Sequence, residues 1–427
     1  MIDKQPSCDD VFEPALLPVD VARERLFSSL QAVRESEILS IEDALYRVLA
    51  DDVISTVNVP AQANSAMDGY ALHHSQIPDS GERTLSIVGT AWAGKPCREQ
   101  VMDRQAVRIF TGGIMPEGTD TVVIQEHVRL HEDNDRLIDI DHEVQAGKNV
   151  RPAGEDVAVG QCVLAAGRQL QAADIGVLAS LGIGQVNVVR RLRVAFFTTG
   201  DELRSLDDQE PGQPLQPGLL FDSNRYTLAA LLKGLDVDTI DLGIVGDNEA
   251  DTRDALAKAG ALADVVLTSG GVSAGDADYV TRAFHDLGKV SFWKLAMRPG
   301  RPLAYGTIRD AVFFGLPGNP VAVMVTFLEF VQPAIKYLSG MHDVEPLCIP
   351  ATCLSTLRKS LGRVEYQRGV MRVDSTGQLV VESTGKQGAG KLSSMSVANC
   401  LIVIDADVDG VKSGDRVMVQ PFHGLLP

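Results

Sequence analysis

The stretch V-V-L-T-S-G-G-V-S-A-G-D-A-D, Val265 to Asp278, determines the fold that we predict for the chain. A β-branched apolar run leads into a loop with three glycines and two serines, and a stretch with helical potential, 279–287, follows. Glycine adopts backbone angles closed to other residues, so the amides of Gly270, Gly271 and Gly275 can turn towards a ligand at the positive end of the next helix. The pattern indicates a strand, an anion-binding loop and a helix, although the glycines could equally serve a tight turn alone.

A second glycine loop, G-L-P-G-N-P, strengthens the case for a ligand site. It follows an apolar strand at 311–314 and opens a long apolar helix at 321–338. Pro320 suits the first turn of that helix, because its missing N–H would have no partner there.

Strands alternate with helices between Arg193 and Leu295. We predict strands at 193–197, 237–245, 263–267 and 290–295, and helices near 225–233 and at 249–259, the second capped by Asp247 and Asn248 and stopped by Gly260. This alternation predicts a mostly parallel, doubly wound sheet, in which ligands bind at the carboxyl ends of the strands. Polar residues that follow successive strands, and would share that edge, are Thr199, Asp201, Glu202, Asp247, Ser269, Ser273, Asp276, Asp278, Lys294, Arg298, Arg301 and Asn319.

The N-terminal half has a different pattern. We predict an amphipathic helix at 18–33 that Asp20 helps to cap, and a second helix at 40–49 with a capping-box-like start. Short alternating strands broken by Gly and Pro from 58 to 150 predict a small inserted β-barrel or sandwich. Three polar clusters in or next to this region could each be a plain turn but together suggest a site on one edge: N-S-A-M-D-G-Y-A (64–71), T-G-G-I-M-P-E-G-T-D (111–120) and R-P-A-G-E-D (151–156).

Length alone suggests two to four domains, and we predict the following boundaries. Residues 15–35 and 192–340 form the doubly wound α/β domain that carries the ligand site. Residues 36–57 and 151–191 form a small α+β connecting domain, residues 58–150 the inserted β domain, and residues 341–427 a C-terminal β-barrel-like domain.

Composition limits the classes of partner. The chain of 427 residues has 39 Lys and Arg against 57 Asp and Glu, a formal charge of −18, which argues against nucleic-acid binding and anionic membranes. Its six cysteines form no C-x-x-C pair, so we expect reduced thiols. We see no signal sequence and no uninterrupted apolar run of ~18 to 20 residues, and therefore expect a cytoplasmic protein.

The candidate edge residues restrict the chemistry. No histidine lies in these loops, which disfavours Ser-His-Asp and Cys-His hydrolysis; no P-loop motif is present, and the turn T-T-G-D-E-L lacks a dinucleotide-binding fingerprint. Carboxylates remain, in Glu202, Asp247 and Asp278, which could hold Mg²⁺ beside loops and basic groups that hold an oxyanion. For Asp247, a helix N-cap is the alternative role.

Several motifs, in one order, resemble those of the molybdopterin molybdenumtransferases, the MoeA family that is related to the E domain of gephyrin. They are N-S-A-M-D-G-Y-A, T-G-G-I-M-P-E-G-T-D-T-V-V-I-Q-E, R-P-A-G-E-D, T-T-G-D-E-L, D-S-N-R, T-S-G-G-V-S-A-G-D-A-D-Y, W-K-L-A-M-R-P-G-R-P, G-L-P-G-N-P and K-L-S-S-M-S-V-A-N-C. The resemblance extends from about Leu17 to Phe422.

This resemblance implies a homodimer in which each protomer has four domains. An adenylyltransferase-like sheet domain carries the nucleotide and molybdopterin site, which the β domain of the partner subunit completes. It implies Mg²⁺-dependent insertion of molybdate into adenylyl-molybdopterin, with release of AMP and molybdenum cofactor. Further implied partners are the molybdopterin adenylyltransferase and downstream molybdoenzyme chaperones, with no nucleic acid and no membrane.

The resemblance also assigns residues. The catalytic positions are Asp68, Thr111, Glu202, Asp247 and Asp278, of which Glu202, Asp247 and Asp278 would bind the metal. The substrate-binding positions are Arg151, Asp156, Ser269, Gly270, Gly271, Ser273, Gly275, Asp276, Lys294, Arg298, Arg301, Pro317, Gly318, Asn319, Pro320, Ser393 and Ser394. Arg298 and Arg301 stand where the family often has Lys, which changes the contact geometry but keeps the charge. Thr198 replaces a frequent Ser and keeps the hydroxyl.

Two other classes of function stay open. A scaffold protein is one, because the E domain of gephyrin also clusters receptors, but nothing here resembles a long linker or an appended adenylyltransferase domain. An adenylyltransferase or another nucleotide hydrolase is the other, and the additional β domains with their M-D-G-Y-A cluster argue against it.

Overall fold

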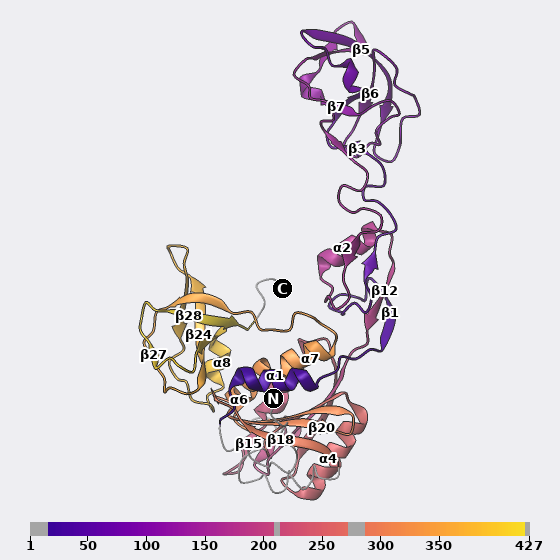
Figure 1. Ribbon diagram of the computed structural model, residues 1–427. Helices are drawn as coiled ribbons and strands as arrows, with labels where there is room; N and C mark the ends of the chain where they lie inside the picture. Colours follow the sequence, from indigo (N-terminus) through magenta and orange to yellow (C-terminus); the bar gives the residue numbers. More distant parts are fainter. Residues whose placement is uncertain (1–15, 209–213, 272–286, 423–427) are drawn as a thin grey trace, which may run out of the picture. The chain divides into compact units, whose positions relative to one another are not determined.

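The computed structural model describes residues 16–208, 214–271 and 287–422, which fall into two compact units (Figure 1). Unit 1 comprises the described residues of 1–37, 46–50 and 189–427, and unit 2 comprises 38–45 and 51–188. The finer division into four domains stays a prediction.

Unit 1 contains a six-stranded mixed sheet. Its order is β16 (Asp238–Val245), β13 (Arg193–Thr199), β17 (Val265–Ser269), β21 (Ala311–Leu316), β20 (Pro302–Ile308) and β18 (Gly288–Lys294). The first four strands are parallel, as predicted, but β20, which the sequence pattern did not indicate, is antiparallel to both of its neighbours. Since β18 then runs in the direction of the parallel strands, its carboxyl end lies at the same edge of the sheet.

Helices cover both faces of this sheet. One face packs against α1 (Val19–Ser29), α3 (Ser223–Lys233) and a long helix made of α6 (Pro320–Thr326), the π-helical η4 (Phe327–Val331) and α7 (Gln332–Leu338); α4 (Glu249–Leu262) covers the other. Phe196 and Phe314 are buried on the first face, and their neighbours Phe197 and Phe313 on the second. Side chains alternate along a strand, so strands buried on both faces are apolar throughout. The doubly wound architecture is therefore present.

The long helix at 320–338 is a core element. It has 19 residues and is apolar enough by length and composition to cross a membrane, but 78% of its most apolar window is buried inside the protein, as in core helices of folded domains. Glu329 and Lys336 interrupt its apolar sequence, which agrees with the expectation that no uninterrupted apolar run of this length is present. Arg23 of α1 reaches the buried Glu329, with Nη2 2.6 Å from Oε2. Burial raises the pKa of Glu329, while the charge of Arg23 opposes the rise.

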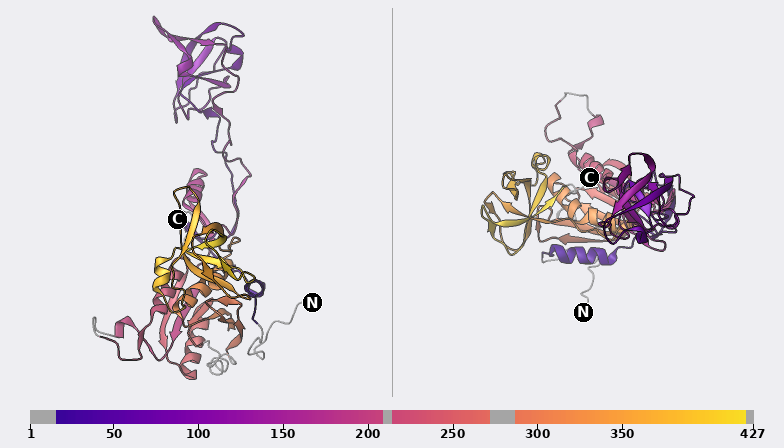
Figure 2. Two further views of the ribbon diagram at one scale, coloured as in Figure 1. Left: turned by 90° about the vertical axis from the view of Figure 1, so that its left-hand side faces the viewer. Right: turned by 90° about the horizontal axis from the view of Figure 1, so that it is seen from above.

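A closed five-stranded barrel forms the C-terminal part of unit 1. Its strands are β24 (Val364–Val373), β25 (Leu379–Ser383), β22 (Ile349–Cys353), β28 (Arg416–Pro421) and β26 (Cys400–Ile404), and pairing of β26 with β24 closes the ring. The short β19 (Met297–Arg298) pairs in parallel with β24 and so joins the segment after β18 to the barrel. Both views of Figure 2 show the yellow barrel beside the orange strands of the sheet. The smaller elements of unit 1 are β14 (Leu203–Arg204), η3 (Leu206–Asp208), β15 (Leu220–Phe221), β23 (Leu357–Arg358), α8 (Ser393–Val397) and β27 (Gly410–Val411).

Unit 2 is built on a second six-stranded sheet. Its order is β7 (Thr121–Ile124), β4 (Gly69–Leu72), β6 (Gln105–Ile109), β5 (Glu82–Ala91), β9 (Asn134–Asp141) and β8 (Arg129–His131). Strand pairs β3 (Asn64–Ser65) with β10 (Val150–Arg151), β2 (Val53–Ile54) with β11 (Cys162–Leu164), and β1 (Ser36–Ser40) with β12 (Gln185–Val189) connect to it. The remaining elements are η1 (His74–Gln76), η2 (Gln125–His127) and α2 (Ala172–Ser180).

Three predictions of local structure are wrong. Residues 40–49 do not form a helix: Ser40 ends strand β1 and turns follow within 41–46, where Tyr46 has a φ of 66°, which a right-handed helix does not allow. Helix α1 ends at Ser29, where Leu30 becomes extended, and the side chain of Asp20 does not cap it. Helix α4 continues through Gly260, where a Cβ would lie 2.8 Å from Ile308 Cγ2, so this glycine allows close packing on β20.

Candidate functional site at the carboxyl edge of the sheet

The loops after β17 and β21 meet at the carboxyl edge of the sheet in unit 1. Gly270 has a φ of 96°, and a Cβ there would lie 2.5 Å from the carbonyl oxygen of Thr199. Its amide donates to Leu316 O at 3.2 Å, and its Cα lies 3.9 Å from the position that a Cβ on Gly318 would take. Glycine is therefore required at 270 both for its backbone angle and for the close approach of the neighbouring strand.

Asn224, at the start of α3, fastens these two loops together. Its Nδ2 donates to Ser269 Oγ at 2.9 Å and to Gly318 O at 2.7 Å, while Ser269 Oγ donates to Pro317 O at 3.2 Å. We predicted no role for Asn224, although it lies in the D-S-N-R motif. Among the described residues, Asn224 Oδ1 and Thr199 Oγ1 are buried without a hydrogen-bond partner. Buried orphan polar atoms at a loop edge are typical of a site that water or a ligand completes.

A cavity of about 450 Å³ opens between these loops and the barrel. This volume is in the range of small-molecule sites. The described lining residues are Gly270, Gly271, Arg298, Pro299, Gly300, Arg301, Pro302, Pro317, Gly318, Asn319, Ala322, Gln387 and Ala389. Seven predicted substrate-binding residues are thus brought together, including both arginines. Ser269, Lys294 and Pro320 are not among the described lining residues, although Ser269 positions the loop through its hydroxyl.

A second cavity, of about 380 Å³, shares Arg298, Pro299 and Gln387 with the first and extends into the barrel. Arg298 Nη1 lies 3.5 Å from Glu365 Oε1, and the buried Arg368 also lines this cavity. Burial, together with the charge of Arg298, lowers the pKa of Arg368 to about 10. Arg368 Nε donates to Ser394 Oγ at 3.1 Å, so the predicted Ser394 acts here by positioning an arginine. Ser393 is exposed at the start of α8.

Two of the three predicted metal-binding carboxylates lie on neighbouring loops. Glu202 follows β13, Asp247 follows the adjacent β16, and both are exposed. The loops touch, since the Asp247 amide donates to Asp201 Oδ1 at 3.1 Å. Asn248 is the N-cap of α4, accepting from the Asp251 amide at 2.9 Å, so the cap role considered for Asp247 belongs to its neighbour. Exposed carboxylate oxygens on adjacent loops fit the ligand preference of Mg²⁺.

Four predicted site residues lie outside the described residues: Ser273, Gly275, Asp276 and Asp278. The predicted helix at 279–287 also falls almost entirely in that segment.

Unit 2 has its own group of predicted residues. Asp68 Oδ1 accepts hydrogen bonds from the amide and the hydroxyl of Thr111, both at 2.8 Å. These two bonds, the backbone one first, and the charge of Arg108 lower the pKa of Asp68. Asn64 pairs with Arg151 in the β3–β10 ladder, so the three polar clusters of the sequence meet here. Asp156 is exposed and its amide donates to Val59 O at 3.0 Å, which places it on a separate turn.

An aromatic stack, which the sequence analysis did not predict, adjoins Thr111. The rings of Trp92 and Phe110 are stacked, with centroids 4.0 Å apart and an angle of 7° between the planes. The Arg108 guanidinium lies 5.3 Å from the Phe110 ring centroid and 5.8 Å from that of Tyr70. Trp92 is 51% exposed, so one large flat ring faces solvent. The available signal in the sequence was Phe110, an aromatic residue directly before Thr111, together with Trp92 as its possible partner.

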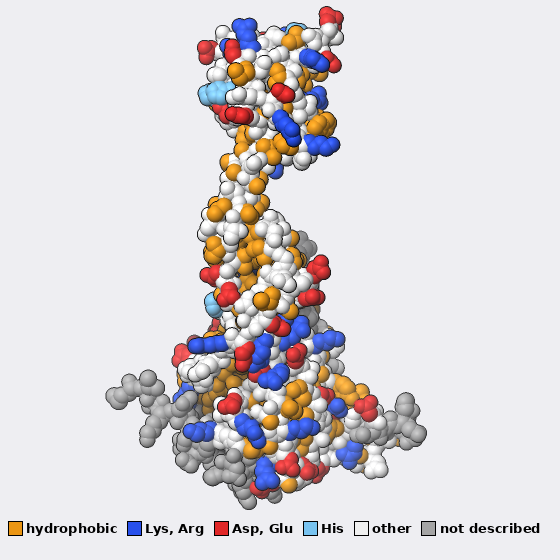
Figure 3. Space-filling view, turned by 90° about the vertical axis from the view of Figure 1, so that its right-hand side faces the viewer, with side chains coloured by type: hydrophobic (Ala, Val, Ile, Leu, Met, Phe, Trp, Pro, Cys, Tyr) orange, Lys and Arg blue, Asp and Glu red, His pale blue; other side chains and the backbone are white. Residues whose placement is uncertain are grey.

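The surface carries charges of both signs. On the face drawn in Figure 3, acidic and basic side chains are interspersed, without one extended basic area. Arg298 and Arg301 line the cavity of a chain whose formal charge is −18.

Comparison with known proteins accounts for nearly the whole chain. Three family models match: the MoeA N-terminal region, domains I and II, at residues 17–182; a probable molybdopterin binding domain at 195–337; and the MoeA C-terminal region, domain IV, at 350–422. A molybdopterin molybdenumtransferase of Haemophilus influenzae is 42% identical over 412 residues, covering 96% of this chain and 100% of that protein. The chain belongs to the molybdopterin molybdenumtransferase family.

Other relatives agree with this membership. A molybdopterin molybdenumtransferase of a Nostoc species is 39% identical over 402 residues, covering 92% of this chain and 90% of that protein. Gephyrin of Dictyostelium discoideum is 30% identical over 450 residues, covering 94% of this chain and 62% of gephyrin. The structure of a molybdopterin biosynthesis MoeA protein from Pyrococcus horikoshii matches with a TM-score of 0.82 and 26% identity over 96% of this chain and 100% of that one. The protein is thus a transferase of molybdenum cofactor biosynthesis, and the predicted family is confirmed.

Proposed function

We propose that this molybdenumtransferase inserts molybdate into adenylyl-molybdopterin in a Mg²⁺-dependent reaction that releases AMP and molybdenum cofactor. The observation that carries the proposal is the cavity of about 450 Å³ at the carboxyl edge of the sheet, with two arginines and two glycine loops in its lining. This cavity lies almost entirely within residues 195–337, the segment matched by the probable molybdopterin binding domain. A ligand with phosphate groups and a polar ring system suits such a lining.

The glycine loops and the arginines bind the anionic parts of the substrates. Gly270 and Gly318 allow the loop backbones to approach a phosphate closely, and Asn224 holds the two loops in register. Arg298 and Arg301 offer planar groups with several donors, which suit bidentate contacts to phosphate or molybdate. Arg368, held by Ser394, adds a cation where the second cavity joins the first at Arg298.

The carboxylates hold Mg²⁺. Glu202 and Asp247 are two of its ligands from this chain, and we propose Asp278 as the third. When bound, Mg²⁺ neutralises phosphate oxygens and so lets an anionic substrate approach these carboxylates. Asp201 contributes indirectly, because its side chain accepts from the Asp247 amide and fixes the distance between the two loops.

Two copies of the chain form a homodimer, and Asp68 and Thr111 of each copy complete the sheet-edge site of the partner subunit. A carboxylate that already accepts two hydrogen bonds stays ionised, and the exposed Trp92 ring, stacked on the neighbour of Thr111, can stack on a heterocycle of the substrate. Arg151 supplies a cation to the same edge.

The proposal has three further parts: the division into four domains, the adenylyltransferase-like character of the sheet domain and a cytoplasmic location.

The direct test is a reconstituted reaction. Purified protein is incubated with adenylyl-molybdopterin, Mg²⁺ and molybdate, and AMP and molybdenum cofactor are quantified in the same samples. We expect equal amounts of both products, and a loss of both when either Mg²⁺ or molybdate is omitted. Formation of adenylyl-molybdopterin from molybdopterin and Mg·ATP would instead identify an adenylyltransferase.

A further inference from the structure

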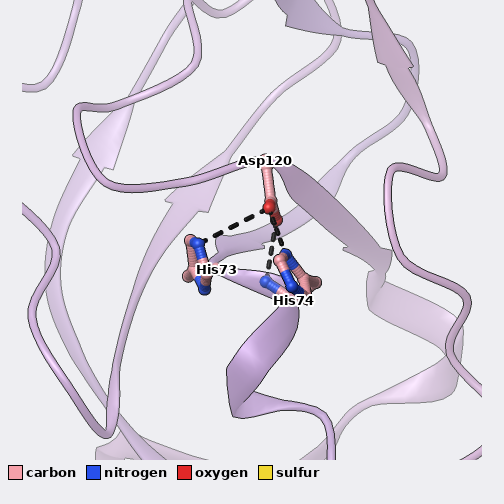
Figure 4. Close-up of side chains that lie close together, drawn as sticks. All are labelled: His73, His74 and Asp120. Atoms are coloured by element: carbon pink, nitrogen blue, oxygen red, sulfur yellow. Dashed lines mark hydrogen bonds and ion pairs between the residues drawn. The ribbon is translucent and has the colours of Figure 1, made fainter.

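Two histidines and one aspartate of unit 2 converge outside the candidate site. His74 Nδ1 lies 2.5 Å from Asp120 Oδ2, and His73 Nε2 lies 3.7 Å from the same oxygen. The three potential ligand atoms are all within 4.8 Å of one another. Figure 4 shows both imidazole rings turned towards the single carboxylate.

Strand pairing places these residues together. His73 and His74 directly follow β4, Asp120 directly precedes the antiparallel β7, and Leu72 pairs with Thr121 between them. The Asp120 amide donates to Leu72 O at 3.0 Å, and the His74 amide donates to Asp120 Oδ1 at 2.7 Å. The backbone therefore fixes the three Cα positions, and only side-chain rotation is needed to adjust the ligand atoms.

Further hydrogen bonds orient the side chains. Thr121 Oγ1 donates to Asp120 Oδ1 at 2.9 Å, which leaves Oδ2 for the imidazoles. His73 Nδ1 accepts from the Ser75 amide at 3.2 Å and lies 2.8 Å from Ser75 Oγ, and these contacts hold the ring while Nε2 lies on the side of Asp120. Protein metal sites use such outer hydrogen bonds to set the direction of their histidines.

The cluster is separate from the residues proposed for the reaction. Asp68 precedes β4 and His73 follows it, so a strand of four residues lies between them. At about 3.3 Å per residue, the two ends are roughly 16 Å apart. A ligand bound by the histidines therefore does not touch Asp68 or Thr111.

We propose that His73, His74 and Asp120 bind one divalent transition-metal ion, of which Zn²⁺ is the representative. Two imidazole nitrogens and one carboxylate oxygen are the ligand set of Zn²⁺, Ni²⁺ and Cu²⁺, whereas Mg²⁺ prefers oxygen ligands only. All three residues are at least partly exposed, so an ion can enter from solvent and complete its coordination with water. Bound metal would clamp η1 to the beginning of β7.

The test is a Zn²⁺ titration of the full-length protein at neutral pH, followed by competition with a chromogenic chelator. The cysteines can also bind Zn²⁺, so the decisive quantity is the difference between the wild-type protein and the double variant His73→Ala/His74→Ala. We expect the double variant to bind one ion fewer per protomer, and each single variant to bind that ion about tenfold or more weakly. The proposal is overturned if the double variant binds the same number of ions with the same affinity.

A matched control is present in the same unit. His131 Nε2 lies 3.0 Å from Asp139 Oδ2, but Arg129 shares that carboxylate and no second histidine joins it among the described residues. His131→Ala should therefore leave the number of bound ions unchanged. His73→Ala is a second variant that should keep the fold, because the side-chain hydrogen bonds described for His73 are local ones to Ser75. Addition of Zn²⁺ should raise the melting temperature of the wild type more than that of this variant. An equal rise in both proteins would contradict the site.

Discussion

Thr111 donates two hydrogen bonds to a single oxygen of Asp68, one from its amide and one from its hydroxyl, each 2.8 Å long. The pair joins two polar motifs that are more than forty positions apart in the chain. It also accounts for most of the lowered pKa of Asp68.

Thr111→Val removes the hydroxyl bond and keeps the amide bond. We expect the pKa of Asp68 to rise towards its ordinary value of 3.8 but to stay below it. Because the folded-state pKa is depressed, this contact contributes stability above the ordinary pKa and loses it as the pH falls through the folded value. Carboxyl NMR titration measures the shift, and Thr111→Ser should leave the pKa as in wild type. An unchanged pKa in Thr111→Val would contradict the assigned hydrogen bond.

Arg298→Ala should weaken binding of the anionic substrate, because the cavity loses a cation shared by both of its compartments. Loss of one charge-assisted contact costs about 1.5–3 kcal/mol, or roughly tenfold to a hundredfold in affinity. Arg298→Lys should restore much of the binding. Equilibrium binding of adenylyl-molybdopterin is the measurement. Arg253→Ala is the control, because Arg253 is an exposed arginine of α4 that forms an ion pair with Asp254. Wild-type affinity in Arg298→Ala would remove this residue from the site.

Gly270→Ala should destabilise unit 1 and lower activity together. The new methyl group would lie 2.5 Å from Thr199 O, and the φ of 96° disfavours any side chain. Backbone strain of this kind costs about 1–3 kcal/mol. Thermal unfolding measures the loss of stability. Gly218→Ala is the comparison, because Gly218 also has a positive φ, of 90°, but a Cβ there would meet no atom within 4 Å. Equal stability of Gly270→Ala and the wild type would show that the loop tolerates the close contact.

Trp92→Ala should raise the KM for adenylyl-molybdopterin if this ring stacks on the substrate. Stacked aromatic pairs contribute about 0.5–1.5 kcal/mol beyond the area they bury, so we expect a change of roughly two- to tenfold. Trp92→Phe should keep most of the effect, because it preserves a flat ring next to Phe110. Steady-state kinetics of AMP release provides the measurement. Identical KM values for the three proteins would exclude Trp92 from substrate binding.

The sequence predicted the parallel strands of unit 1 well, because a strand buried on both faces is a continuous apolar run bounded by glycine. It did not predict β20, whose residues 302–308 contain Pro302 at the start and Gly306 within, both unfavourable signals for a strand. The false helix at 40–49 has a similar cause. Ser40 and Asp43 match a capping box, but Ser40 Oγ accepts from the Glu42 amide and caps a turn.

The candidate site was predictable where motif residues follow strands directly. Gly270, Gly318 and Arg298 lie in the cavity as expected, because topology alone brings successive strand ends to one edge. Asn224 and Trp92 could not be placed in the same way. Asn224 acts from a helix start, and Trp92 acts through a stacking partner 18 positions away, so neither contact follows from the local pattern. We expected Thr198 to keep the hydroxyl of the family's frequent Ser. That hydroxyl donates a hydrogen bond to the buried Asp222.

The central claim is that residues of unit 1 and residues of unit 2 serve one reaction across a dimer. Asp68→Ala and Glu202→Ala proteins, each inactive alone, are mixed under conditions in which subunit exchange is shown to occur, and AMP release is measured. A shared site predicts recovery of roughly a quarter of wild-type activity, since half of the dimers are mixed and each of these has one intact site. No recovery despite proven exchange would contradict the shared site.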